Sequence, residues 1–222
     1  MNILYEDKDI LVAEKPAGVP VESRRIGTAD MVSLLKNYLA EKNPDRPPYL
    51  GLIHRLDQPV QGIMVFGKTP KAAAALSAQI SQGTMEKIYR AVVCGILPEK
   101  GTLSDYLLKD GRTNTSRVVP KGTPGAKPGK LNYQRLGAIP DEELSLAEIH
   151  LLTGRHHQIR VQMAHAGFPL YGDRKYNIHP TTIPGENVAL CAWSLTFLHP
   201  TSGKKLTFSC TPAETVFQKF NP

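Results

Sequence analysis

Asp57 is the first side chain whose surroundings suggest chemistry. It ends the stretch His54-Arg55-Leu56-Asp57, which Pro59 and Gly62 follow closely, so we expect it to lie in a loop. A carboxylate among a histidine, an arginine and apolar neighbours is either half of a structural ion pair, the commoner case, or a poised nucleophile or base. These residues alone leave both possibilities open.

A second cluster, residues 153–160 (TGRHHQIR), places two adjacent histidines between two arginines. If a helix begins near His156, then His156 and Arg160 are four residues apart and share a face that could present a cation to an anion. Ile159 and Met163 would share another face, suited to the core. The histidines lack the i, i+4 spacing and the placed carboxylate or thiolate of a zinc site, so we expect no metal.

A third element, Lys87-Ile88-Tyr89-Arg90-Ala91, lies at the start of a predicted strand. In an alternating strand Lys87, Tyr89 and Ala91 point to one face. An aromatic ring flanked by cations could stack on a nucleobase, although Tyr89 could equally be a core or interface tyrosine.

Residues 62–69 fit the lettering of a phosphate-binding P-loop, but their composition argues against one. The four middle residues are Ile, Met, Val and Phe, which prefer a buried strand to a polar nest, and the residues before Gly62 cannot supply the required strand. We therefore predict a buried strand here and no nucleotide site.

The composition is that of a basic globular chain. The 222 residues are 41% hydrophobic and carry a formal charge of +7, enough apolar content for one substantial core or two modest ones. Residues 109–130 hold six cations against one acid, with several prolines and glycines, which predicts a flexible basic arm. Such charge favours a polyanionic partner such as nucleic acid, or serves only to keep the surface solvated.

Several protein classes are excluded by what the sequence lacks. No apolar run approaches the roughly 18 to 20 residues of a membrane span, and we expect no secretory signal at the start. The three cysteines are scattered and odd in number, which indicates a reducing cytoplasm rather than a disulfide framework. The ordinary apolar content excludes a disordered chain.

Strand-like and helix-like segments alternate without a clean βαβ rhythm, so we predict the α+β class. Strands are expected over 3–5, 10–13, 63–66, 88–97 and 144–152, with two more between 188 and 208 joined by a turn at 199–203. Helices are expected over 31–39, capped by Thr28 or Asp30, over 70–82, capped by Thr69, and over 156–166, ended by Gly167.

Several motifs occur together and in order. HRLD has a glycine five residues after the aspartate, and KIYRA, TGRHHQIR with HAGFPLYGD, and LCAWSLTFLHP follow. With the opening ILYEDKDILVAEKPAGV, they resemble the RluA-type RNA pseudouridine synthases over residues 3–208. The resemblance implies a mixed, largely antiparallel sheet with flanking helices and a central active-site cleft, in one catalytic domain over residues 1–222.

Two departures from the family accompany this resemblance. The family usually has a Thr-Ser pair before the glycine that follows HRLD, where this sequence has Val60-Gln61. We also expect the S4-type RNA-binding module of many relatives to be absent. RNA would then be held by the catalytic domain, including residues 109–130.

The resemblance also implies a reaction and roles for residues. The family detaches uracil from C1′, turns it and reattaches it through C5, with no cofactor or metal. By match to the motifs, Asp57 is the catalytic carboxylate, Arg160 is its ion-pair partner, and Tyr89 stacks on the target base. Whether Asp57 attacks the sugar, adds to the base or removes a sugar proton stays open.

RNA contacts are expected at a further set of residues. Arg55 resembles the residue that fills the place vacated by the extruded base. The other expected RNA contacts are His54, Lys87, Lys121, Lys127, Lys130 and Arg155. The partner would be structured ribosomal RNA, transfer RNA or both, with no membrane, and we expect a monomer.

Two alternatives from other classes stay open at this point. A catalytically inactive RNA-binding protein of the same fold would explain the altered Val60-Gln61 pair. A glycoside hydrolase would also cleave a bond at C1′, but that class normally needs two facing carboxylates, and no second acid accompanies Asp57 in these motifs.

Overall fold

The protein folds into two compact units, each described here by itself. The structure, a computed structural model, describes residues 2–23, 27–178 and 187–220. Unit 1 comprises residues 1–87 and 192–211, and unit 2 comprises residues 88–191 and 212–222. The chain passes from one unit to the other three times, a connectivity compatible with the single catalytic domain expected from the sequence.

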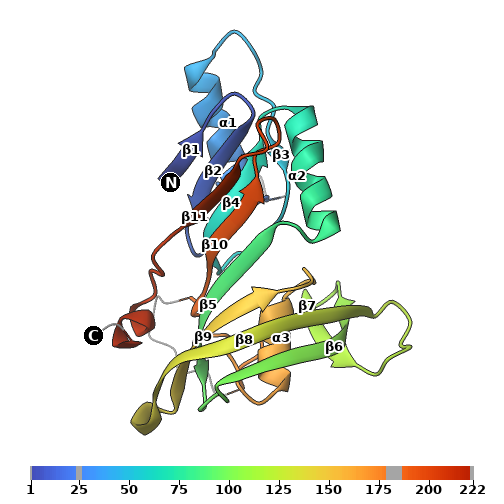
Figure 1. Cartoon of the computed structure of the whole chain (residues 1–222), viewed down its shortest axis with the longest axis vertical. Coiled ribbons are helices and arrows are strands. Elements are labelled where there is room, and N and C mark those ends of the chain that lie inside the picture. The colour runs from blue at the N-terminus through green and yellow to red at the C-terminus, as the bar shows by residue number, and fades with distance from the viewer. Residues whose placement is uncertain (1, 24–26, 179–186, 221–222) are drawn as a thin grey trace. The chain divides into compact units, whose positions relative to one another are not determined.

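Unit 1 is built on a sheet whose strands lie in the order β1-β2-β4-β10-β11, with the short β3 also paired to β4 (Figure 1). The β1–β2, β2–β4, β3–β4 and β10–β11 pairs are antiparallel. The strand bounds are β1 Asn2–Glu6, β2 Ile10–Lys15, β3 Gly51–Leu52, β4 Gln61–Gly67, β10 Leu190–Leu198 and β11 Lys205–Ser209. Of β10, the residues from Ala192 onward belong to this unit.

The two helices of unit 1 begin at the capping residues that the sequence offers. In α1 (Met31–Lys42) the Asp30 side chain accepts the N–H of Ser33 at 2.8 Å, and in α2 (Pro70–Gln82) Thr69 accepts the N–H of Ala72 at 3.1 Å. Gly83 ends α2 in the left-handed conformation. The helix predictions over 31–39 and 70–82 are therefore confirmed.

The strand β4 is the centre of the unit 1 core. All seven of its residues are buried, as predicted for the stretch that resembles a P-loop only in its letters. Gly62 has φ +148°, and a Cβ there would lie 2.4 Å from the Cβ of Ala192, so only glycine allows β10 to approach. The core cluster comprises Ile10, Val12, Ile63, Val65, Ala72, Leu76, Met85, Leu195 and Phe197.

Unit 2 is an antiparallel sheet in the order β5-β9-β8-β6-β7, with α3 against its β6 and β7 strands (Figure 1). Ile159 and Met163 of α3 are buried, as predicted. The bounds are β5 Glu86–Cys94, β6 Lys100–Asp110, β7 Thr115–Val119, β8 Lys127–Ile139, β9 Leu144–Leu151 and α3 Gln158–His165, with single 3₁₀ turns at Pro140–Glu142 and Thr215–Phe220.

The prediction of a flexible basic arm over 109–130 is wrong for half of that segment, which lies in β-strands. Residues 115–119 pair with 106–110, and residues 127–134 pair with 100–107, so the segment contributes to three antiparallel strands in which β6 lies between β7 and β8. The glycines and prolines that suggested irregular structure are concentrated in the turns, and Pro128 lies within β8 opposite Tyr106. Backbone pairing over long strands outweighs the breaker residues.

The helix predicted from His156 begins two residues later. His157 has φ +53°, outside the helical region, and α3 starts at Gln158. The side-chain Oε1 of Gln158 accepts the Thr153 hydroxyl at 2.8 Å and the N–H of Arg155 at 3.0 Å, which closes a turn before the helix. His156 and Arg160 therefore do not share a helical face.

With mixed helices and largely antiparallel strands, the fold is of the predicted α+β class. The helices in the described ranges are all too short or too polar to cross a membrane.

Candidate active site

The loop that carries Asp57 lies in unit 1, between β3 and β4. Leu56 is buried and anchors the loop, and the N–H of Val60 donates to the carbonyl oxygen of Asp57 at 3.0 Å, which closes a tight turn. The Asp57 side chain is partly exposed. The turn therefore fixes the backbone of the carboxylate residue while leaving it accessible.

A buried lysine that the sequence analysis missed holds this loop. Lys15, at the end of β2, is 0% exposed, and its Nζ donates to the carbonyl oxygens of Pro16 (2.8 Å), Val19 (2.7 Å) and Gln58 (2.9 Å). Burial lowers the pKa of Lys15 to about 7, and the charge of Asp57 opposes that shift. The ammonium group thus joins β2 to the residue that follows the carboxylate.

His54 and Lys87, two of the expected RNA contacts, both lie in unit 1 and are partly exposed. Nε2 of His54 accepts the N–H of Val65 in β4 at 3.3 Å. Burial, together with the charge of Lys87, lowers the pKa of His54 to about 3, and burial also lowers the pKa of Lys87. The neutral His54 ring therefore bonds a strand backbone within unit 1, and the RNA contacts expected of His54 and Lys87 stay predictions.

Arg55 has the opposite environment. Its side chain is 72% exposed and its Nη2 lies 2.7 Å from Oε2 of Glu22. A solvent-exposed pair of this kind contributes little to stability. Arg55 is therefore available to an incoming ligand, as expected of a residue that contacts RNA.

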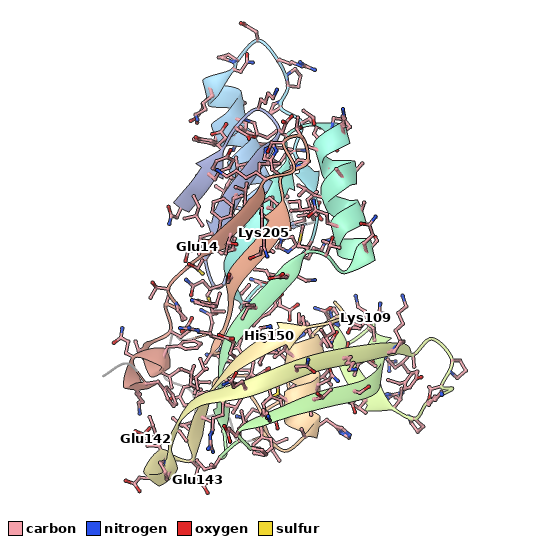
Figure 2. All side chains as sticks on the ribbon, viewed as in Figure 1. Glu14, Lys109, Glu142, Glu143, His150 and Lys205 are labelled. Carbon is pink, nitrogen blue, oxygen red and sulfur yellow. The ribbon has the colours of Figure 1, made fainter. Side chains whose placement is uncertain are left out.

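The Val60-Gln61 pair, where this sequence departs from the family that it resembles, has a structural role. Val60 is 2% exposed. Gln61 donates through Nε2 to Oε1 of Glu14, labelled in Figure 2, at 2.5 Å, and to the carbonyl oxygen of Thr211 at 2.9 Å. The pair thus fills the core and ties β4 to neighbouring segments of unit 1.

In unit 2, Tyr89 lies on β5 opposite Ile149 of β9. Its side chain is 7% exposed and Ala91, on the same side of the strand, is fully buried. This face of β5 is therefore the packed one, and Tyr89 is buried on it.

Arg160 forms a buried bidentate ion pair with Asp173. Nε of Arg160 donates to Oδ2 of Asp173 at 2.7 Å, and Nη2 donates to Oδ1 at 2.7 Å. The two side chains are 4% and 0% exposed. The guanidinium plane is therefore fixed inside unit 2 by a partner that the sequence analysis did not identify.

The two adjacent histidines stack on each other beside this pair, with ring centroids 3.7 Å apart. Burial and the nearby charges of Lys109, Lys175 and Arg160 lower the pKa of His156 to about 4 and that of His157 to about 3. Both rings are thus neutral at pH 7 and serve as hydrogen-bonding groups. Lys109, labelled in Figure 2, lies near the end of β6.

The remaining expected RNA contacts lie on one part of unit 2. Arg155 donates through Nε to the carbonyl oxygen of Pro128 in β8 at 2.9 Å, which places it beside the strand that carries Lys127 and Lys130. Both of these lysines are exposed, as is Lys121 in the turn between β7 and β8.

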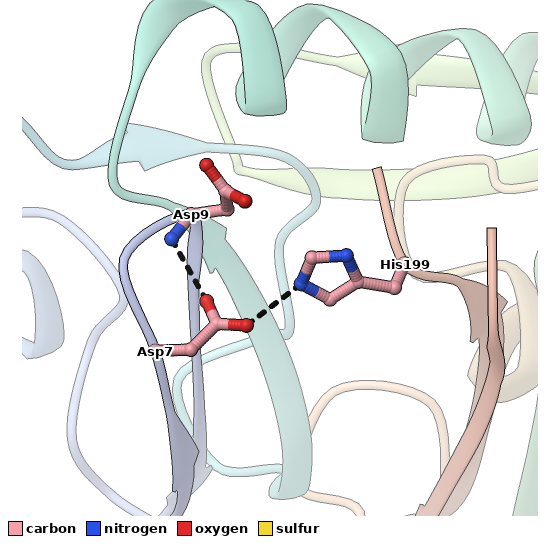
Figure 3. A group of neighbouring side chains, drawn as sticks. All are labelled: Asp7, Asp9 and His199. Carbon is pink, nitrogen blue, oxygen red and sulfur yellow. Dashed lines mark hydrogen bonds and ion pairs between the residues drawn. The ribbon is translucent and has the colours of Figure 1, made fainter. Parts of the chain in front are cut away.

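Among the described residues, one group offers metal-ligating atoms close together, namely Asp7, Asp9 and His199 (Figure 3). Oδ1 of Asp7 accepts two backbone N–H groups, one from Asp9, and Oδ2 accepts the Tyr5 hydroxyl at 3.0 Å and Nε2 of His199 at 2.8 Å. Nδ1 of His199 accepts backbone N–H groups of the following turn. Because the side-chain atoms of Asp7 and His199 are engaged, we assign this pair to a tie between two turns of unit 1. Oδ2 of Asp9 is buried and has no hydrogen-bond partner within the described part of the chain.

The expected site residues are divided between the two units. Unit 1 holds His54, Arg55, Asp57 and Lys87, and unit 2 holds Tyr89, Lys121, Lys127, Lys130, Arg155 and Arg160. The two members of the Asp57–Arg160 pair expected from the resemblance lie in different units, and the pair stays a prediction.

The sequence matches the RNA pseudouridylate synthase family over residues 9–165, a range that contains Asp57, Tyr89 and Arg160. The chain belongs to this family. Ribosomal large subunit pseudouridine synthase D of Neisseria meningitidis serogroup A is 34% identical over 229 residues, covering 98% of this chain and 59% of the relative. The enzyme of the same name from Pseudomonas aeruginosa is 35% identical over 181 residues, covering 79% of this chain and 53% of the relative. The chain thus spans less than two thirds of the length of these two relatives.

Two solved structures share the fold of this pseudouridylate synthase family member. Human RNA pseudouridylate synthase domain containing 4 superposes with a TM-score of 0.78 at 21% identity, covering 96% of this chain and 88% of that one. Human RNA pseudouridylate synthase domain containing 1 gives a TM-score of 0.74 at 24% identity, covering 95% and 82%.

Proposed function

We propose that this protein is an RNA pseudouridine synthase that isomerises specific uridines of ribosomal RNA, transfer RNA or both. The observation that carries the proposal is the family match over residues 9–165, within which the HRLD, KIYRA and TGRHHQIR motifs occur in order. The names of the two bacterial relatives, ribosomal large subunit pseudouridine synthases, support ribosomal RNA as a substrate.

The proposed reaction conserves atoms and oxidation state. The bond between C1′ and N1 breaks, the uracil turns, and a bond forms between C1′ and C5. The proton on C5 leaves and N1 gains one, so only proton transfer and a catalytic carboxylate are needed. Asp57 supplies the carboxylate, on a loop that the Lys15 ammonium group fixes.

Arg160 and Tyr89 complete the proposed catalytic group. A guanidinium within about 4–6 Å of a carboxylate keeps the carboxylate ionised and orients it, which is the role proposed for Arg160 toward Asp57. Tyr89, buried on β5, is proposed to stack on the target base. Its phenol is the group proposed to assist the final deprotonation at C5.

The RNA is proposed to contact exposed cations outside this group. Extrusion of a base from a folded RNA costs a few kcal/mol, and the exposed Arg55 fills the vacated place. Lys121, Lys127 and Lys130, together with Arg155 beside β8, contact phosphates. Since the three cysteines are scattered along the sequence and odd in number, a reducing cytoplasm is the proposed location.

The test is a map of pseudouridine in total RNA from a strain that lacks this gene. Carbodiimide modification and primer extension should show at least one lost site, which the wild-type gene restores and Asp57→Asn does not. A strain that keeps all its sites, together with no activity of the purified protein on bulk RNA, would instead support the inactive RNA-binding alternative.

A further inference from the structure

The buried ion pair between Arg160 and Asp173 has no evident purpose in stability. Both side chains lie in the interior of unit 2, and removing two charges from water costs about as much as their attraction returns. A pair of apolar residues would fill the same volume at no such cost. Stability therefore does not explain this buried ion pair. A better explanation is that the pair fixes the position of the Arg160 guanidinium.

Asp173 is itself held rigidly. Its Oδ1 accepts the backbone N–H groups of Lys175 at 2.9 Å and Tyr176 at 3.3 Å, and its own backbone joins Leu170 and Asn177. These bonds form a tight turn that presents the carboxylate to α3. The carboxylate thus acts as a fixed template rather than as a mobile counter-ion.

The guanidinium of Arg160 is also covered on its face. Its Cζ lies 5.2 Å from the ring centroid of Tyr176, and the Tyr176 hydroxyl accepts the N–H of Ser116 at 2.8 Å and bonds Nδ1 of His157 at 2.7 Å. Asp173 bonds the edge of the guanidinium group, and the Tyr176 ring lies over its face. Two independent contacts therefore fix the orientation of one group.

We propose that Asp173 is a positioning residue for the isomerisation, which acts by fixing the orientation of the Arg160 guanidinium within unit 2. The proposal rests on the proposed function. The bidentate contact takes two of the five guanidinium donors, Nε and one on Nη2, and sets the direction of the others. Because Asp173 also neutralises the charge of Arg160, the arginine acts through directed hydrogen bonds more than through net charge.

The experiment first measures pseudouridine formation by the wild-type protein on an RNA whose modified site is known. Failure here would remove the proposed function and is distinguishable from failure of the present proposal. With active wild type, Asp173→Asn should lower kcat about 100-fold, the effect of a misplacement of about 1 Å. KM and the RNA dissociation constant should stay within about twofold, because Asp173 makes no proposed RNA contact.

A double-mutant cycle separates positioning from general structural damage. Arg160→Lys keeps the charge but cannot form the bidentate contact, so adding Asp173→Asn to it should cause little further loss of kcat. Glu142→Gln, which removes an exposed ion pair with Lys219 in the same unit, is the matched control and should leave kcat unchanged. Additive losses in the cycle would overturn the proposal.

Asp173→Glu provides the test if Asp173→Asn does not fold. It keeps the negative charge but moves the carboxylate by one methylene, so a folded Asp173→Glu protein should bind RNA normally and turn over slowly. Wild-type kcat in that variant, or in a folded Asp173→Asn, would show that the orientation of Arg160 does not depend on this carboxylate.

Discussion

Lys15 and Gln58 are joined by a hydrogen bond of 2.9 Å from the ammonium Nζ to the backbone carbonyl oxygen. Gln58 directly follows Asp57, so this bond fixes the end of the turn that carries the carboxylate. The ammonium group makes two more bonds of the same kind, to Pro16 and Val19. One fully buried cation therefore connects β2, the segment after it and the Asp57 loop.

Replacing Lys15 by methionine keeps most of the side-chain volume but removes all three hydrogen bonds. Three carbonyl oxygens then lose a partner, so we expect the free energy of unfolding to fall by about 3 kcal/mol. In the fraction that is folded, the loop shifts and kcat falls about tenfold or more. Urea denaturation and steady-state kinetics measure the two effects separately.

Lys36→Met is the matched control, because Lys36 is an exposed residue of α1 in the same unit. It should leave both stability and kcat close to wild type. A Lys15→Met protein as active as the control would mean that the loop holds its shape without the ammonium group.

Asp57→Asn tests whether Asp57 acts in the chemical step and not in RNA binding. The substitution keeps the size of the side chain and removes its charge, so turnover should fall by about 10³-fold or more while the RNA dissociation constant changes little. Filter binding and tritium release from labelled uridine at C5 give the two quantities. A large loss of RNA affinity would contradict the assignment of Asp57 to the chemical step.

The three exposed lysines of the β7–β8 region are expected to contact phosphates. Changing Lys121, Lys127 and Lys130 to glutamine should weaken RNA binding and reduce the slope of log Kobs against log salt by about 2 to 3. The matched control changes Lys36, Lys71 and Lys204, which are exposed lysines of unit 1. Equal slopes for the two triple variants would leave the β7–β8 lysines without a phosphate contact.

Local sequence patterns predicted the helix ends and the buried strand, which depend on interactions between residues close together in the sequence. Asp30, Thr69 and Gly83 mark helix ends because each satisfies backbone groups within one turn. The buried strand at residues 62–67 followed from its unbroken apolar run. The strands β6, β7 and β8 were missed, since the glycines and prolines of residues 109–130 suggested a flexible arm and the pairing of β6 with both β7 and β8 overrides them.

Sequence motifs predicted the candidate catalytic residues. They did not predict the residues that hold these side chains or their loops in place. Asp57, Tyr89 and Arg160 stand in recognisable patterns, whereas Lys15 is one lysine at the end of an apolar strand. Asp173 stands in the HAGFPLYGD phrase, but no spacing relates it to Arg160 thirteen residues earlier. The helix start at Gln158 was also missed, because the left-handed His157 is stabilised by Tyr176, which lies later in the chain.

Glu6 should make the stability of unit 1 sensitive to acid. Burial opposes ionisation of this carboxyl, but hydrogen bonds from Lys42, Lys68 and Tyr38 outweigh it and lower the pKa of Glu6 from 4.5 to about 2. Its oxygens lie 2.8 Å from Nζ of Lys42 and 2.7 Å from Nζ of Lys68, and its side chain is 16% exposed. The folded state therefore holds the charged form of Glu6 more strongly than the unfolded chain does.

Because the pKa of Glu6 is lower in the folded state, its contribution is fully present above pH 4.5 and is lost as the pH falls towards 2. The contribution is at most about 3 kcal/mol. We expect Glu6→Gln to unfold at lower urea concentration than wild type at pH 7 and the difference to shrink steadily between pH 4.5 and 2. Glu41→Gln, at an exposed position of α1, should show neither effect. A difference between Glu6→Gln and wild type that stays constant down to pH 2.5 would mean that the stabilisation comes from packing and not from the charge of Glu6.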